Sequence, residues 1–103
     1  MKALITRQWH GTTLKKDADT YLNYLEQTGI PGYKKTPGLQ SVEVWRKIEG
    51  DICHFWTVTK WDSWQSIEGF TGPDLNKAKY YPEDANYLLS QEATVQHYET
   101  FVY

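Results

Sequence analysis

The 103-residue sequence is poor in cysteine and has no long apolar run. With Cys53 as the single cysteine, one chain can form neither an internal disulfide nor a zinc site built from several cysteines. Residues 3–5 are too short for the apolar part of a secretion signal, and no later stretch approaches the ~20 apolar residues of a membrane span. We therefore expect a cytoplasmic protein with no membrane contact.

An excess of positive charge is also absent. Eleven Lys or Arg face thirteen Asp or Glu, a net charge of -2, so we expect no nucleic-acid partner. Charged residues at 23% and aromatic residues at 16% exclude a disordered chain. The length suits one domain over residues 1–103, because single cores are commonest at roughly 100–150 residues.

What the sequence has in excess is aromatic residues: five Trp, eight Tyr and three Phe. Each ring buries about 150–250 Å² of surface, and the interior of one small domain is too small for all of them. The surplus predicts that some rings contact a second copy of the chain.

The pattern of the first half predicts a strand, a helix and a loop. Residues 2–10 read as a strand that Gly11 ends. Thr13 is placed to cap a helix that Gly29 and Pro31 would end. One apolar stripe at helical spacing supports that helix: Leu14, Ala18, Tyr21, Leu22 and Leu25. Residues 30–38 are then a loop.

The second half predicts a hairpin, a short helix and a last strand. Residues 39–48 and 52–61 form the hairpin around Gly50. Asp62 would cap the short helix together with Gln65. Further helical turns are expected at 74–79 and 82–89, before a strand at 93–102.

This element order predicts an α+β fold, the ferredoxin-like βαββαβ arrangement with a four-stranded antiparallel sheet of order 4-1-3-2. Helices would cover one face of the sheet. The third strand is apolar in both directions, with Phe55 on one side and Trp56 and Val58 on the other. A homodimer that packs two sheets face to face would cover the second face. The alternative is that the second face is exposed to water, and that its amphipathic aromatic side chains lie there without a partner chain.

Four segments of this sequence resemble the antibiotic biosynthesis monooxygenase family: Arg7-Gln8-Trp9-His10-Gly11, Trp61-Asp62-Ser63, Tyr80-Tyr81-Pro82-Glu83-Asp84 and Thr94-Val95-Gln96-His97-Tyr98-Glu99. The resemblance implies a dimeric α+β barrel. It also implies cofactor-independent oxygenation of aromatic substrates, in which the deprotonated substrate itself reduces O₂. A related branch degrades haem, but the sequence has no histidine between Phe55 and Gln96 to serve as the iron ligand.

The resemblance and the residue types together give a set of candidate site residues. His10 and His54 could accept a proton from a phenolic substrate, since the ordinary pKa of histidine, near ~6.5, suits that role. Trp61 matches the family's pocket tryptophan, although a Trp at a strand–helix junction is more often part of the core. The pocket candidates are Trp56, Phe70, Tyr80 and Tyr81.

The roles of the histidines and of Arg7 stay open. The three histidines His10, His54 and His97 could form a metal site only if they shared one face of the sheet, and we expect no metal and no cofactor. Arg7 needs a partner if its side chain points inward. Glu43 and Glu99 are candidates, and an ion pair at the dimer interface and substrate binding are equally consistent with the sequence. The family's pocket arginine has no evident counterpart.

The expected function is thus a cofactor-independent monooxygenase acting on a small aromatic or polycyclic phenol. The alternative is a non-catalytic dimer that binds or senses a small hydrophobic molecule. Haem degradation is the least favoured of the three.

Overall fold

A computed structural model describes residues 1–103. In chain order the elements are strand β1 (Lys2–Leu14), 3₁₀ turn η1 (Lys15–Asp17), helices α1 (Ala18–Gln27) and α2 (Gly29–Lys34), strands β2 (Leu39–Glu49) and β3 (Ile52–Trp61), helix α3 (Trp64–Thr71), 3₁₀ turn η2 (Asp84–Asn86) and strand β4 (Gln96–Val102). The strands form one antiparallel sheet of order β2-β3-β1-β4. The predicted fold class and strand order are confirmed.

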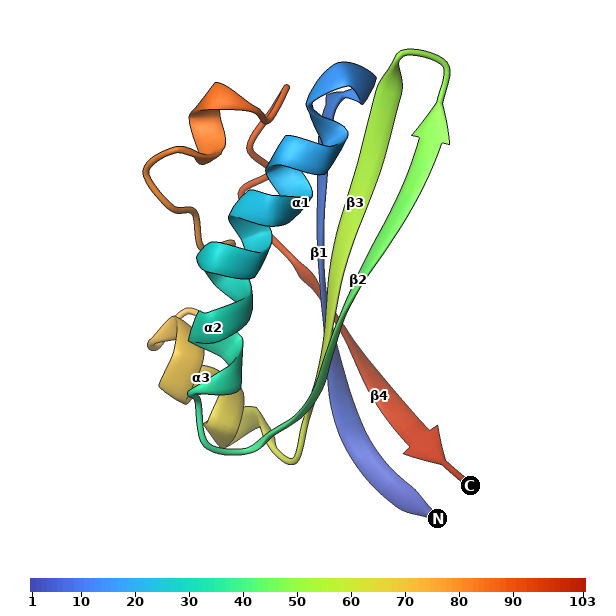
Figure 1. Ribbon diagram of the computed structural model, residues 1–103. Helices are drawn as coiled ribbons and strands as arrows, with labels where there is room; N and C mark the ends of the chain where they lie inside the picture. Colours follow the sequence, from blue (N-terminus) through green and yellow to red (C-terminus); the bar gives the residue numbers. More distant parts are fainter.

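All the helices lie on one face of the sheet, as Figure 1 shows. Alternate residues of β1 and β3 point under them, so Trp9 and Phe55 are buried. We call this the helix face and the opposite side the open face. Segment 72–95 joins α3 to β4 and contains η2; it lies beside the helices (Figure 1), runs along the edge of β1 at Leu88 and Leu89, and reaches His10 of the open face through Glu92.

The first strand is longer than predicted. It continues beyond residue 10 to Leu14, and Thr13 pairs with Cys53 instead of capping a helix. Gly11 does not end the strand either. A Cβ at Gly11 would lie 2.5 Å from the ring of Trp9, so the glycine leaves room for that ring to lie along the strand.

The first helix begins and ends differently from the prediction. It starts at Ala18, after η1, and a break at Thr28 is followed by a second helix. Gly29 therefore begins α2 rather than ending α1. Pro31 is accommodated because it lies in the first turn of α2, where a backbone N–H has no intrahelical acceptor.

The hairpin is confirmed, with Gly50 at a positive φ of 59° in its turn. The cap of α3 is Ser63 rather than Asp62, because the Ser63 hydroxyl accepts the hydrogen bond from the Ser66 amide. Of the helical turns expected after α3, only η2 forms, within the predicted range 82–89. The last strand starts at Gln96, three residues later than predicted.

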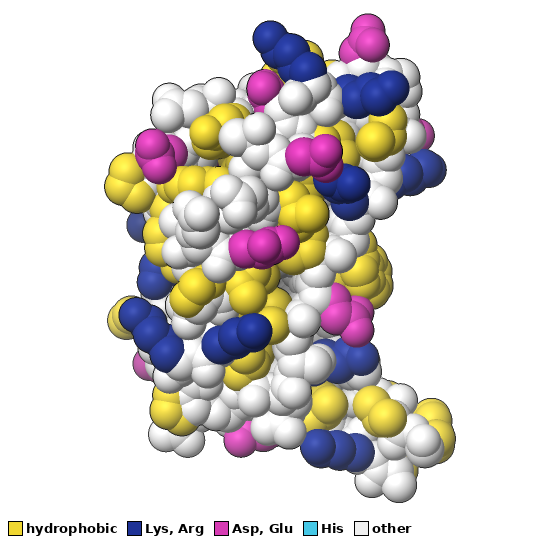
Figure 2. Space-filling model, in the orientation of Figure 1, with side chains coloured by type: hydrophobic (Ala, Val, Ile, Leu, Met, Phe, Trp, Pro, Cys, Tyr) yellow, Lys and Arg dark blue, Asp and Glu magenta, His cyan; other side chains and the backbone are white.

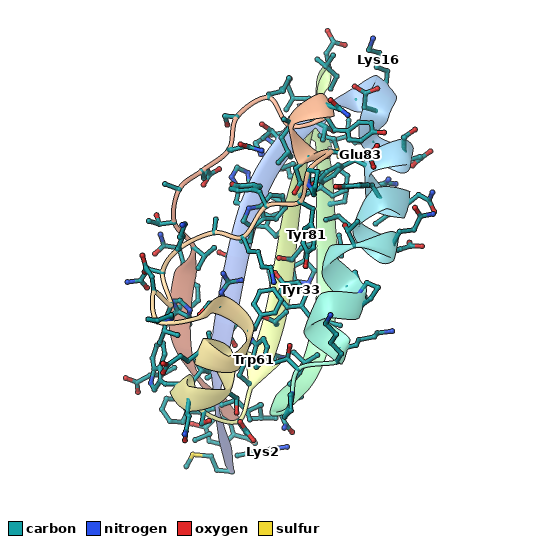
Figure 3. All side chains as sticks on the ribbon, turned by 90° about the vertical axis from the view of Figure 1, so that its left-hand side faces the viewer. Lys2, Lys16, Tyr33, Trp61, Tyr81 and Glu83 are labelled. Carbon is teal, nitrogen blue, oxygen red and sulfur yellow. The ribbon has the colours of Figure 1, made fainter.

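The side chains between the sheet and the helices form two apolar clusters. The larger one lies under α1 and includes Trp9, Tyr21 and Phe55. The smaller one lies under α2 and α3 and consists of Tyr33, Trp61, Ile67 and Phe70. In Figure 3, Tyr33 and Tyr81 lie between the sheet and the helices, and Trp61 lies near the lower end of that layer.

The open face of the sheet is mixed in character. Trp45 is opposite Trp56 in the β2–β3 register, and Trp45 is 48% exposed. Charged residues such as Glu43 and Lys60 also belong to this face. The prediction that the third strand carries apolar side chains on both faces is thus correct. On the surface that Figure 2 shows, charged side chains are interspersed with hydrophobic ones. No helix has the length and apolarity needed to cross a bilayer.

Candidate functional site

A small cavity lies between the helix face of the sheet and the layer made by α1, α2 and segment 72–95. Most of its walls are aromatic rings and aliphatic side chains, and the floor comes from β1 and β3. The lining residues are Arg7, Trp9, Tyr21, Leu25, Gly29, Tyr33, Thr57, Lys79, Tyr80, Tyr81 and Asp84. We call it the Arg7 cavity.

Arg7 is only 2% exposed, because β1 points its side chain under the helices. One terminal guanidinium nitrogen donates to the Tyr33 hydroxyl at 3.4 Å, and the other donates to the Lys77 carbonyl at 3.2 Å. Its Nε–H has no acceptor. Neither of the acidic partners considered from the sequence, Glu43 and Glu99, forms an ion pair with Arg7.

The other charged groups at the cavity do not neutralise Arg7. Lys79 makes no ion pair, and its Nζ lies 4.7 Å from the centroid of the Phe70 ring. The carboxylate of Asp84, which is 3% exposed, accepts from the Tyr21 hydroxyl at 2.9 Å and from the Tyr81 amide at 2.5 Å. The cavity is lined by two cationic side chains, Arg7 and Lys79, and by one carboxylate, Asp84, so the net charge of its lining is positive.

Hydroxyl groups supply the remaining polar atoms of the cavity. The Tyr33 and Thr57 hydroxyls lie 3.3 Å apart, and the Trp9 indole donates to the Tyr80 hydroxyl at 3.2 Å. Burial raises the pKa of the Tyr80 and Tyr81 hydroxyls, so both are neutral at physiological pH. The cavity therefore offers neutral hydroxyls beside a fixed positive charge.

Without a ligand the Arg7 cavity has a volume of about 20 Å³, which is room for about one water molecule. A surface hollow of about 440 Å³ lies beside it and shares Lys79 and Tyr81 as walls. The Tyr81 ring lies against α2, where a Cβ at Gly32 would be 2.8 Å from its hydroxyl. The side chains of Lys79 and Tyr81 are the walls that the cavity and the hollow share.

The structure places the residues predicted for the pocket in three different locations. Tyr80 and Tyr81 line the Arg7 cavity, and Phe70 lines the neighbouring hollow. Trp61 is fully buried in the cluster with Tyr33 and Phe70 and does not line the cavity. Trp56 lies on the open face.

His10 and His54 also lie on the open face, with the sheet between them and the Arg7 cavity. Their rings stack on each other and on Trp56, and His10 Nε2 is 3.0 Å from His54 Nδ1. Glu92 and Glu49 contact the outer ring nitrogens at 2.5 and 2.8 Å. This arrangement does not bring either imidazole to a substrate in the Arg7 cavity.

The third histidine is on the other side of the sheet. His97 pairs with Arg7 in the β1–β4 register, and its ring lies against Trp64. The three histidines therefore do not share a face, which the sequence alone could not decide. Burial, and secondly the positive charge of Arg7, lowers the pKa of His97.

This lowered pKa predicts a pH-dependent stability. The unfolded chain binds a proton at His97 near pH ~6.5, whereas the folded chain does so only at lower pH. Between these values the unfolded state holds more protons, so stability is present above about pH 6.5 and is lost as pH falls through the folded pKa. Urea unfolding at pH 7.5, 6.5 and 5.5 should show this fall, and His97→Gln should reduce it. An equal fall in the variant would contradict the prediction.

Sequence reasoning named Tyr80 and Tyr81 as pocket candidates but did not name most of the other lining residues, among them Tyr33, Lys79 and Asp84. Alternation along β1 could have placed Arg7 and Trp9 on one face. Tyr33 could not have been placed, because the sequence predicted a loop where α2 forms.

The similarity of this chain to known proteins is a similarity of fold. No family model matches the sequence, and no curated protein matches it. A Bacillus cereus protein assigned as an antibiotic biosynthesis monooxygenase superposes with a TM-score of 0.60 at 13% identity, over 99% of this chain and 94% of that chain. The haem-free haem-degrading protein of Mycobacterium tuberculosis gives 0.60 at 13% identity, over 99% and 96%.

A protein of the ethyl tert-butyl ether (EthD) family from Bacillus halodurans gives a TM-score of 0.58 at 15% identity, over 95% of this chain and 99% of that chain. These likenesses establish that the chain has the fold of the antibiotic biosynthesis monooxygenase-like proteins. The resemblance inferred from the sequence is confirmed at that level.

Proposed function

We propose that this protein binds a small aromatic molecule in the Arg7 cavity and oxygenates it without a resident cofactor. The supporting observation is the cavity itself, whose walls are aromatic rings and whose polar atoms are few and fixed. Rings such as those of Trp9 and Tyr33 suit stacking or edge contacts with an aromatic ligand. The shared fold with an assigned monooxygenase agrees with this proposal.

The proposed reaction needs a substrate that is electron-rich as an anion. A phenol that loses its proton can reduce O₂, and one oxygen atom then becomes a new carbonyl oxygen of a quinone. The other oxygen atom leaves as water with the two hydrogens that the substrate gives up. The protein would orient the substrate and exclude water, with the Tyr33 and Thr57 hydroxyls donating to the phenolate oxygen.

Oxygen uptake tests this proposal. Metal-free and flavin-free protein is mixed with naphthols and hydroxynaphthoic acids in an oxygen electrode. Uptake above the buffer rate is expected, and Tyr33→Phe should lower it at least tenfold because a hydroxyl donor is lost. Tyr87→Phe is the matched control, since the Tyr87 ring packs near the same core without lining the cavity. Ligand binding without uptake would instead favour the non-catalytic binding protein.

We further propose that two chains pair through their open faces. Trp45 and Trp56 are adjacent across β2 and β3, and Tyr98 on β4 is half exposed on the same side. Sedimentation at micromolar concentration should give twice the chain mass of 12.1 kDa, and Trp45→Lys should shift it toward the single chain. A wild-type protein that sediments as one chain would overturn this proposal.

A further inference from the structure

The Arg7 cavity holds two cationic side chains that no acidic side chain neutralises. Arg7 is almost completely buried, and its Nε–H has no acceptor. Its two hydrogen bonds, at 3.4 and 3.2 Å, are long for a charged donor, which usually bonds at ~2.7–2.9 Å. Lys79, at the rim shared with the outer hollow, contacts only the faces of the Phe70 and Tyr81 rings.

A buried guanidinium in this state is unfavourable for folding. Removing a charge from water costs several kcal/mol, and two long hydrogen bonds to neutral oxygens and a cation–π contact with the Phe70 ring, 5.5 Å from its centroid, recover only part of that. Asp84 lines the same cavity but forms no ion pair with Arg7, and its two oxygens accept hydrogen bonds from the neutral Tyr21 hydroxyl and Tyr81 amide. No side chain forms an ion pair with the Arg7 guanidinium, so its free Nε–H donor is available to an anionic ligand.

We propose that the ligand of the Arg7 cavity is an aromatic carboxylic acid whose carboxylate binds Arg7. This inference rests on the proposed function and names the substrate class of the same site. The planar guanidinium fork matches the two oxygens of a carboxylate, and its free Nε–H is one of the donors such a pair uses. The aromatic walls then hold the ring.

The position of Lys79 gives the acid a route of entry. Its ammonium group stands between the outer hollow and the cavity, and Tyr81 stands beside it. An anion that enters from the hollow meets Lys79 first and Arg7 second, so its path runs from an exposed to a buried cation. A free phosphate would use the same charges but could not fill the ring-lined part of the cavity.

The test compares an aromatic acid with its uncharged methyl ester and with an anion that has no ring. Binding of 1-hydroxy-2-naphthoate, its methyl ester and inorganic phosphate is measured by calorimetry on the wild-type protein. The acid should bind at least thirtyfold more tightly than the ester, and phosphate should bind more weakly than the acid. Equal binding of acid and ester, or stronger binding of phosphate, overturns the inference.

Variants then locate the effect. Arg7→Met and Arg7→Gln should each reduce the affinity for the acid to that for the ester, while the affinity for the ester stays within a factor of three. Lys79→Gln should slow association of the acid and lower its dependence on salt. Lys60→Gln is the matched control, because Lys60 is a cation of the open face, and it should change nothing. An acid preference that survives in Arg7→Met overturns the inference.

The thermal stability of the variants provides an independent check. Arg7→Met replaces an unpaired buried charge with an apolar side chain of similar length, so its melting temperature in the absence of ligand should rise above that of the wild type. A fall in melting temperature together with an unchanged acid preference would mean that Arg7 serves the fold rather than a ligand. If Met cannot be tolerated, Arg7→Lys keeps the charge without the fork and should lose most of the acid preference.

Failure of this inference can be separated from failure of the proposed function. If the ester or a naphthol is consumed with O₂ as fast as the acid, the oxygenase proposal stands and the carboxylate inference fails. If the acid binds through Arg7 but no O₂ is taken up, the carboxylate inference stands and the oxygenase proposal fails.

Discussion

Trp61→Ala is expected to lower the free energy of unfolding by about 3–5 kcal/mol, the usual range for deleting a large buried aromatic side chain. Trp61 has no exposed surface, and its ring contacts the rings of Tyr33 and Phe70. Its indole N–H donates to the Thr59 hydroxyl at 2.8 Å, so the variant also removes this donor, although the Thr59 hydroxyl still donates to the Arg7 carbonyl at 3.3 Å. Urea unfolding followed by circular dichroism measures the loss.

Trp64→Ala is the matched control, because Trp64 lies three residues further on and is 46% exposed. Its substitution should cost less than about 1 kcal/mol, in line with half-exposed positions. A second variant, Trp61→Phe, tests whether Trp61 is a pocket residue, as the family resemblance implies, or a core residue. Trp61→Phe should fold and keep wild-type oxygen uptake if Trp61 belongs to the core. A stable Trp61→Phe protein with no uptake would show a direct role in the site.

The sheet could be predicted from the sequence because its signals are local. Alternating residues in β3 and the glycine turn at Gly50 placed the hairpin within one residue of its observed ends. The element order then fixed the strand order, since few connections between such elements are allowed. The first helix was less predictable. The apolar stripe from Leu14 to Leu25 fits a helix, but Leu14 extends β1, because pairing with Ile52 of the hairpin continues to that point.

The site was harder to predict than the sheet, because it depends on which face each strand residue takes. His10 and Trp9 are neighbours in the sequence, yet only Trp9 points toward the Arg7 cavity. The sequence predicted that histidines would be the chemically active groups. In the fold, however, His10 and His54 lie on the side of the sheet away from the cavity. Segment 72–95 has almost no regular structure, so its position depends on tertiary hydrogen bonds, such as that from the Leu89 amide to the Thr12 carbonyl of β1.

Asp84→Ala is expected to lower the free energy of unfolding by about 2–4 kcal/mol, because it leaves two buried donors without an acceptor. These are the Tyr21 hydroxyl on α1 and the Tyr81 amide in segment 72–95. Asp84→Asn keeps one acceptor oxygen and should lose less. Asp74→Ala is the matched control in the same segment, since Asp74 is exposed and accepts one long hydrogen bond, from the Asn76 amide at 3.3 Å. Equal losses at positions 84 and 74 would contradict this assignment.

The same substitution should change access to the Arg7 cavity. Asp84 fixes the backbone of Tyr81, and the Tyr81 side chain is one of the two that separate the cavity from the outer hollow. If that barrier limits entry, Asp84→Asn should speed association of 1-hydroxy-2-naphthoate in stopped-flow fluorescence, while Asp74→Ala should not. The closed cavity holds about one water molecule, so entry requires this part of the chain to move. An unchanged association rate in Asp84→Asn would mean that the ligand enters by a route that does not displace Tyr81.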